Sequence, residues 1–295
     1  MTKLLLLLFT ALLSAAPVAA APPLILGLDH IPLAVRDLDQ AGRDFARLGF
    51  TIKPGRPHDN GIRNLHVKFA DRTEIELITA AEPRDALSGE YVDHLRAGDG
   101  PAFVAFYAPD FDALAARLTA LHQPYRHDWA TVALPSPPAL RHIFFSARLA
   151  SPTDSAAYFT HANSADGLIG VWLAGAESPP PELALLEALG ARVAPGRAVN
   201  VPGATTALVA QLAEGEVIFL PAQHQQVPGR RIIGAILSTR DLSALKAAMA
   251  ANGLTAPEPV LTPNGRSIFV PSESAHGLWL EFREQAQTTR SRNNW

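Results

Sequence analysis

Two side chains on predicted strands, His30 and Glu76, have the types and spacing that suggest chemistry. In LDHIPLAV the apolar residues Ile31, Leu33 and Val35 alternate with His30, so a strand would turn the imidazole away from the packed face. The same alternation in TEIELI leaves Glu76 off the packed face. An imidazole and a carboxylate suit a divalent ion such as Zn, Ni, Mn or Fe, so the two side chains could meet on one metal.

The residues between these strands predict a helix followed by further strands. Asp37 can cap the N-terminus of the helix, apolar residues then recur at helical spacing, and Gly49 ends it. A strand, a helix and three more strands of this kind form a curled sheet. The side chains of His30 and Glu76 would both lie on the concave side of this sheet.

The same pattern recurs along the chain. Asp241 and Gly253 bracket a helix of the same length, and further copies begin at Asp110 and Ser178. A unit that repeats every roughly 50 to 75 residues is informative about fold in its own right. We therefore expect an α+β fold of four βαβββ modules that form two halves with curled mixed sheets.

Length and composition limit the possible organisation. The 295 residues exceed one typical domain of roughly 100 to 200, so two halves are expected, at residues 21–165 and 166–284. A net charge of −3 gives no electrostatic footprint for nucleic acid. The chain has no cysteine, which excludes disulfides and thiolate ligands. No oligomeric state is predicted.

The two ends of the sequence differ from the rest. Residues 1–20 combine one lysine, an apolar run and small residues before a cleavage point, which is typical of a secretory signal peptide. The mature protein is therefore expected to be periplasmic or secreted, with no membrane span after cleavage. Residues 285–295 are polar and without apolar period, which predicts a flexible tail.

Several segments of the repeated modules resemble the vicinal oxygen chelate superfamily, specifically its glyoxalase-like domain proteins. The best match is the first module, through LDHIPLAV, the HDNGIRNLHVKF run and TEIELI, while AYFTHAN and HGLWLEF resemble segments of later modules. The resemblance implies that two modules face each other to form a cup. It also implies a divalent metal held by residues from the first and fourth strands of each module.

Mapped onto this sequence, the resemblance places His30 and Glu76 at both ligand positions of module one. The remaining candidate ligands are His161 at the end of module two and Glu281 in module four. Modules one and two together would give the set His30, Glu76 and His161, whereas modules one and four would give His30, Glu76 and Glu281. The other modules carry non-ligating residues at the corresponding positions, namely Phe103, Val171, Gly234 and Ile218.

The resemblance also suggests residues that contact substrate. His58 lies in a polar loop at the rim of the expected cup, Asn64 and His66 follow on the next strand, and Phe103 faces the cup by its position in module two. A carboxylate beside the metal, Glu76 or Glu281, would move the proton in catalysis.

Three functions are compatible with this pattern. The first is an exported, metal-dependent lyase or isomerase acting on a small molecule with vicinal oxygens, in which the metal stabilises negative charge on oxygen. The second is a metal-free protein that binds or sequesters a small molecule. The third is an extradiol-type ring-cleaving dioxygenase, which requires the histidine of module two.

Overall fold

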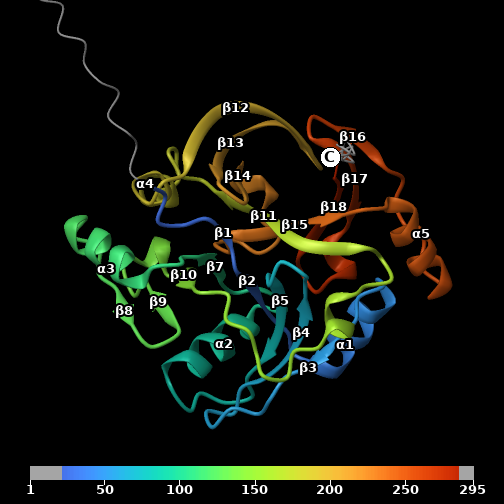
Figure 1. Cartoon of the computed structure of the whole chain (residues 1–295), viewed down its shortest axis with the longest axis horizontal. Coiled ribbons are helices and arrows are strands. Elements are labelled where there is room, and N and C mark those ends of the chain that lie inside the picture. The colour runs from blue at the N-terminus through green and yellow to red at the C-terminus, as the bar shows by residue number, and fades with distance from the viewer. Residues whose placement is uncertain (1–21, 286–295) are drawn as a thin grey trace, which may run out of the picture.

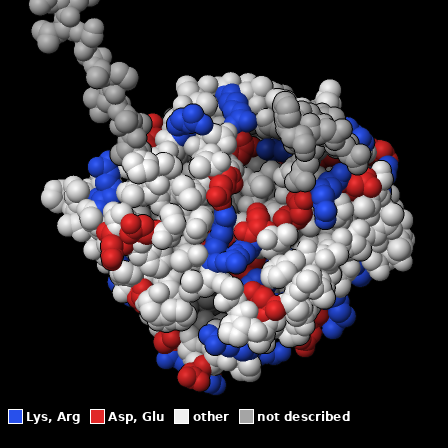
Figure 2. Space-filling model, viewed as in Figure 1, with Lys and Arg blue, Asp and Glu red and all other residues white. Residues whose placement is uncertain are grey.

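The computed structural model describes residues 22–285, and the predicted signal peptide and all but the first residue of the predicted tail lie outside that range. Five α-helices and curled mixed sheets are arranged as two halves (Figure 1). Within the described residues, no helix has the length and apolar character needed to cross a membrane. Acidic and basic side chains are intermixed across the face seen in Figure 2, so neither sign forms a continuous field there.

The first half contains modules one and two. A short strand, β1 (Gly27–Leu28), precedes them. Module one comprises β2 (His30–Ala34), α1 (Leu38–Arg47), β3 (Lys53–Pro54), β4 (Arg63–Lys68) and β5 (Glu74–Thr79). Module two comprises β7 (Val104–Tyr107), α3 (Phe111–Ala120), β8 (Arg126–His127), β9 (Thr131–Ala133), the 3-10 helix η1 (Pro138–Leu140) and β10 (Ile143–Ser146).

Strand pairing shows that module one pairs with module two, which settles the choice left open by the sequence. β1 pairs antiparallel with β7, and β2 pairs antiparallel with β6 (Gly100–Pro101). Leu28 lies opposite Phe106 and Leu33 opposite Pro101, so the two short ladders continue one register. The sheets of the two modules therefore meet along their first strands.

The second half is one continuous sheet. Its eight strands run in the order β12-β13-β14-β11-β15-β18-β17-β16, so modules three and four are joined through β11 and β15. Module three comprises β11 (Ala165–Gly175), α4 (Pro181–Ala188), β12 (Arg192–Val201), β13 (Ala204–Leu212), β14 (Gly215–Pro221) and η3 (Ala222–His224). Module four comprises β15 (Ile232–Thr239), α5 (Leu242–Ala251), β16 (Val260–Thr262), β17 (Gly265–Val270), η4 (Ser272–Ser274) and β18 (Trp279–Glu284).

Helix capping follows the sequence in three of the four modules. Asp37, Asp110 and Asp241 each accept a hydrogen bond from a main-chain N–H in the first turn of their helices. Module three differs, because α4 is preceded by Pro180 and has no side-chain cap. The repeat copy that starts at Ser178 therefore lacks an aspartate cap, and its helix begins at Pro181, where proline is favoured in the first turn.

Module three also corrects one predicted strand position. Val171 lies in the main apolar core, whereas its neighbour Trp172 lies in the separate cluster on the concave side of the second half. β11 pairs with β15 through several irregularities, one of them directly after Trp172. The residue that faces the second cup is therefore Trp172 rather than Val171.

Two connecting segments cover the first half. The helix α2 (Ala86–Arg96) follows β5, and its buried residues Tyr91 and Leu95 pack against Ala34 and Ile78. The segment between β10 and β11 runs across the first half in Figure 1 and contains η2 (Ala156–Phe159). Four modules with curled mixed sheets are confirmed, and the domain limits drawn from the sequence stay predictions.

Candidate functional site

His30 and Glu76 lie on neighbouring strands with their side chains on the concave face of the first half. His30 is opposite Glu74, and Pro32 is opposite Glu76, in the parallel pair of β2 and β5. The His30 Nε2 and Glu76 Oε2 atoms are 3.9 Å apart, too far for a hydrogen bond, and each side chain is 15% exposed. A small polar group could therefore contact both side chains at once.

Each member of the pair is held by another polar side chain. His30 Nδ1 lies 2.5 Å from Asp29 Oδ1, and Glu76 Oε1 accepts a hydrogen bond of 2.6 Å from Asn64 Nδ2. The contact with Asp29 fixes the imidazole so that Nε2 faces Glu76. These contacts orient both reactive atoms toward the same space.

The imidazole of His30 is held in its charged form. Burial lowers the pKa of His30, but the hydrogen bond to Asp29 and the charges of Asp29, Glu76 and Glu74 outweigh it, raising the pKa from 6.5 to about 9. His30 is therefore an imidazolium near neutral pH. A cationic proton donor thus stands beside the Glu76 carboxylate.

Module two supplies aromatic rings where module one supplies these polar groups. Phe144 on β10 lies edge-on to His30 with ring centroids 5.1 Å apart, and Phe103 lies 6.3 Å from Phe144. Tyr91 of α2 packs against Phe103 at 5.5 Å. We call His30, Glu76, Phe103 and Phe144 the concave site, since it joins a polar pair to an aromatic wall.

A second group of charges extends along the concave face of module one. Lys53 and Lys68, whose side chains are 6% and 9% exposed, contact Asp154 from the segment between β10 and β11, at 3.4 and 3.1 Å. Glu74 lies 3.4 Å from both Lys68 and His66. Burial raises the pKa of Glu74, but the hydrogen bond and charge of His66, with the charges of His30 and Lys68, lower it to about 2.

The other residues expected from the sequence lie elsewhere. His161 is buried between Phe50 and Phe69; its Nδ1 accepts a hydrogen bond from the Thr51 N–H at 3.0 Å, and its Nε2 is 2.9 Å from the Lys68 carbonyl oxygen. Both ring nitrogens are therefore engaged by the main chain, and burial lowers the pKa of His161. His161 is a structural histidine here and does not join His30.

Glu281 lies in the cup of the second half, away from the pair. It is 1% exposed and accepts hydrogen bonds of 2.8 Å from Ser267 Oγ and from Arg283 Nε. We therefore correct the predicted ligand sets, since neither His161 nor Glu281 reaches His30 and Glu76. His58 remains in the loop before β4, and its main-chain N–H donates to the Ile62 carbonyl oxygen.

The donor set does not fit a divalent metal held in the way the resemblance implies. Module one contributes His30 and Glu76, but the corresponding strands of module two contribute Phe103 and Phe144. Among residues 22–285, no three His, Asp or Glu side chains are grouped so that they could hold an ion.

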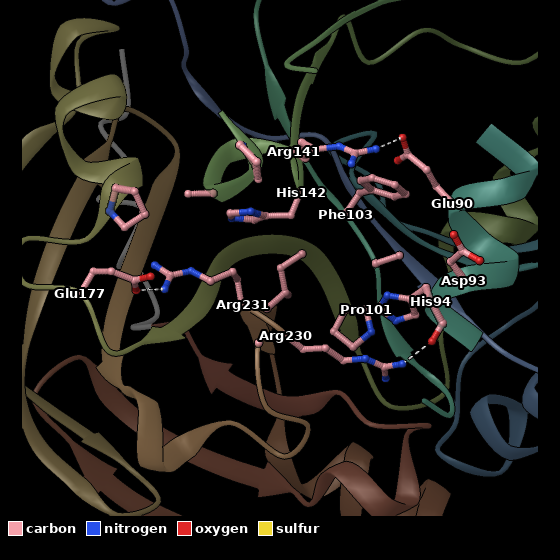
Figure 3. A pocket seen from close by; sticks show the side chains of 16 residues that line it. Glu90, Asp93, His94, Pro101, Phe103, Arg141, His142, Glu177, Arg230 and Arg231 are labelled. Carbon is pink, nitrogen blue, oxygen red and sulfur yellow. Dashed lines mark hydrogen bonds and ion pairs between the residues drawn. The ribbon is translucent and has the colours of Figure 1, made fainter. Parts of the chain in front are cut away.

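A cavity of about 500 Å³ lies beside the concave site, between the two halves (Figure 3). Phe103 belongs to both, whereas His30 and Glu76 do not line the cavity. Its walls come from α2, the segment from β6 to Phe103, η1, the start of α4 and the residues before β15. The volume lies within the range of roughly 300 to 1,000 Å³ found for small-molecule sites.

The fold defines a class of protein, one built from paired βαβββ modules whose sheets curl around a concave face. The glyoxalase-like domain model matches residues 28–189. The chain therefore belongs to the glyoxalase-like domain family. No curated protein matches its sequence.

Solved structures share the fold at low sequence identity. Homoprotocatechuate 2,3-dioxygenase from Brevibacterium fuscum, in complex with 3,4-dihydroxyphenylacetate, is 14% identical with a TM-score of 0.61 over 94% of this chain and 86% of its own. A variant of 4-hydroxymandelate synthase from Streptomyces coelicolor is 17% identical with a TM-score of 0.60 over 90% of this chain and 94% of its own.

A third similar structure is longer than this chain. It is a fusion of a xylose isomerase-like TIM barrel with a 4-hydroxyphenylpyruvate dioxygenase, 13% identical with a TM-score of 0.60 over 94% of this chain. The chain spans about half of its length, 53%. At these identities the similarity is one of fold.

Sequence reasoning missed three parts of the site. Asp29 precedes His30 directly, but its position in LDHIPLAV carries no signal that it would contact the imidazole. Phe144 is one of two adjacent phenylalanines, and only the strand register shows which one faces the cup. Helix α2 had a detectable signal, because Asp85 and Ser88 form a capping box at its start.

Proposed function

We propose that this protein is a lyase or isomerase that moves a proton on a small oxygenated molecule bound in the concave site. The observation that carries the proposal is the 3.9 Å separation of His30 Nε2 and Glu76 Oε2, with each side chain anchored by a different buried partner. A base and an acid so placed can act on adjacent atoms of one substrate.

The proposed step needs no metal. The Glu76 carboxylate removes a proton from a carbon next to a carbonyl group, and the C–H electron pair becomes part of a new C=C bond. The His30 imidazolium donates its Nε2 proton to the carbonyl oxygen, which leaves an enediol when the substrate is a hydroxycarbonyl compound. Return of the proton from Glu76 to the other carbon gives the isomer, and His30 recovers a proton from the second hydroxyl group.

The aromatic wall supports a substrate that carries a ring. Phe103, Phe144 and Tyr91 form a cluster of edge-on contacts directly beside the acid–base pair. The ring-bearing ligand of the homoprotocatechuate dioxygenase complex is consistent with this preference. Export of the chain, which residues 1–20 predict, would place the reaction outside the cytoplasm.

A metal-free binding protein is the second candidate. The observation that favours it is the replacement of donors by Phe103 and Phe144 in the very cup that keeps His30 and Glu76. Such a protein would hold the same molecule without exchanging its protons.

Hydrogen–deuterium exchange separates these candidates. The protein would be incubated with 2-hydroxy-1-phenylethanone, and separately with hydroxyacetone, in deuterated buffer, and NMR would follow loss of the signal from the hydrogens on the carbon that carries the hydroxyl group, next to the carbonyl carbon. We expect exchange above background that survives a chelator and disappears in Glu76→Gln. Glu258→Gln, which removes a carboxylate that is 82% exposed, is the matched control. Binding without exchange would favour the second candidate, and exchange only after metal addition would overturn the metal-free step.

A further inference from the structure

The cavity between the two halves contains one cation that no carboxylate neutralises. Its three lining carboxylates each have an arginine partner: Glu90 with Arg141 at 2.6 Å, Asp93 with Arg96 at 3.0 Å, and Glu177 with Arg231 at 2.6 Å. Among residues 22–285 no carboxylate lies within ion-pair distance of Arg230, the third arginine of the lining. The lining as a whole is balanced, with three carboxylates and three arginines, but Arg230 itself has no carboxylate partner among the described residues and is a local positive charge.

Arg230 is fixed in place by the main chain. It donates to the carbonyl oxygens of Asp99, His94 and Gly98 at 2.6, 2.6 and 2.8 Å, at the C-terminal end of α2 (Figure 3). These three bonds leave two of the five N–H donors of the guanidinium. The rigid position and the remaining donors suit recognition of an anion.

The charge of Arg230 affects a neighbouring side chain. Burial and the charge of Arg230 lower the pKa of His94 to about 4, although its contact with the Gly100 carbonyl and the charge of Asp99 act in the opposite direction. His94 is therefore neutral, and Arg230 remains the uncompensated charge on that side of the cavity.

His142 provides a second polar group on the opposite wall. Its Nε2 is buried and has no hydrogen-bond partner among the described residues. It lies 3.2 Å from Oε1 of the fully buried Glu182, which Arg231 binds through both carboxylate oxygens at 2.8 and 2.7 Å. The imidazole therefore faces the Glu182 carboxylate at the cavity wall, at ion-pair distance but without an aligned hydrogen bond.

The rest of the lining is apolar. Phe103, Pro101 and Ile232 belong to it, and Phe103 lies near Glu90 and Arg141 in Figure 3. Flat apolar side chains of this kind accept a ring or a short hydrocarbon body.

We propose that this cavity is a binding site for a small organic carboxylate with an aromatic body, its anionic end near Arg230 and His142 and its ring against Phe103. The site lies next to the concave site but contains neither His30 nor Glu76. Binding here does not depend on whether that pair moves a proton.

Calorimetric titration of the full mature chain with benzoate tests the proposal, with benzamide as the uncharged analogue. We expect saturable 1:1 binding of benzoate, and at least 10-fold weaker binding of benzamide. Arg230→Met should weaken benzoate binding at least 10-fold and His142→Gln several-fold. Glu76→Gln should bind benzoate as the wild type does, so failure here is distinguishable from failure of the proposed reaction.

Specific results would overturn the site. Equal affinity for benzoate and benzamide, no binding of either, or unchanged benzoate affinity in both Arg230→Met and His142→Gln would each do so. Should Arg230→Met fail to fold through loss of its contacts with α2, the wild-type ratio of the two probes and the His142→Gln variant still decide the question. If Glu76→Gln lost benzoate binding while His142→Gln retained it, the binding site for benzoate would be the concave site and not the cavity.

Discussion

The two halves are built from the same module, yet their concave faces are filled in different ways. In the first half, His30 and Glu76 stay 3.9 Å apart with no hydrogen bond between them, and Phe103 of the same concave site also lines the cavity of about 500 Å³ between the halves. In the second half, Trp172 and Phe269 pack in the cup, and the cavity beside Glu281 has only about 10 Å³. One cup keeps a polar pair that a further group could contact, whereas the other is a packed interior.

The charged groups differ in the same sense. In the second cup, Arg283 donates to Glu281 and to Glu216, each at 2.8 Å, and Arg197 donates to Glu216 at 2.7 Å. Each of these carboxylates is therefore directly bound to an arginine. In the first cup, Asp29 holds His30 and Asn64 holds Glu76, and no hydrogen bond joins His30 to Glu76 across their 3.9 Å separation. A carboxylate at the expected strand position is therefore open to a further contact in the first cup, whereas arginine occupies it in the second.

Removing the carboxylate should slow proton exchange when it is done in the first cup and leave it unchanged when it is done in the second. Glu76→Gln should lower the rate of proton exchange by about 100- to 10,000-fold, because it removes the general base. Glu281→Gln should leave the exchange rate per folded molecule unchanged, since Glu281 does not reach the concave site. NMR exchange rates, normalised to the folded fraction from circular dichroism, give the measurement. A similar loss in both variants would contradict the functional difference between the cups.

The free energy of unfolding, in contrast, should be sensitive to changes in the second cup. Arg283→Met should lower the free energy of unfolding by about 3–5 kcal/mol, because it leaves Glu281 and Glu216 buried with less compensation. Urea denaturation measures this change. Arg96→Met is the control, because Arg96 is 76% exposed and its ion pair with Asp93 should contribute no more than about 1 kcal/mol. Equal losses in the two variants would show that the buried network contributes no more to the free energy of unfolding than an exposed ion pair does.

The pH dependence of stability should come mainly from the first cup. The pKa of His30 is raised to about 9 in the folded state, so its stabilisation is complete below pH 6.5 and is lost as the pH rises toward 9. The free energy of unfolding should fall by roughly 1–3 kcal/mol across that interval. Urea denaturation at constant ionic strength gives the profile. An identical decline in His30→Gln would assign the effect to other groups.

The repeat in the sequence was enough to predict the module, because alternating apolar residues and aspartate caps act locally. Asp37, Asp110 and Asp241 cap their helices as expected. Module three was misread at Val171, since irregular pairing of β11 shifts the side chains, and its helix has a proline-rich start in place of the aspartate cap. Local rules therefore fail where the chain departs from a regular repeat.

The candidate site was predicted only in part. Alternation along β2 and β5 correctly placed His30 and Glu76 on the concave face, because side-chain direction has a period of two. The partners of the pair were not found this way. The contact of Asp29 with its neighbour depends on side-chain rotamers, Asn64 was expected to contact substrate and instead donates to Glu76, and Phe144 and α2 reach the site only through tertiary packing. His161 shows the same limit, because only the folded chain brings the Thr51 N–H and the Lys68 carbonyl to its ring.

The smallest expected effect concerns the segment that covers the first cup and has no counterpart in the second. Asp154→Asn should lower the free energy of unfolding by about 1 kcal/mol, because asparagine keeps an acceptor oxygen for Lys68, which also retains Glu74. Asp93→Asn, in an exposed ion pair, should change it by less than about 0.5 kcal/mol. Urea denaturation compares the two. A loss from Asp154→Asn as large as that from Arg283→Met would mean that the first cup depends on its charges as the second does, which would remove the distinction between them.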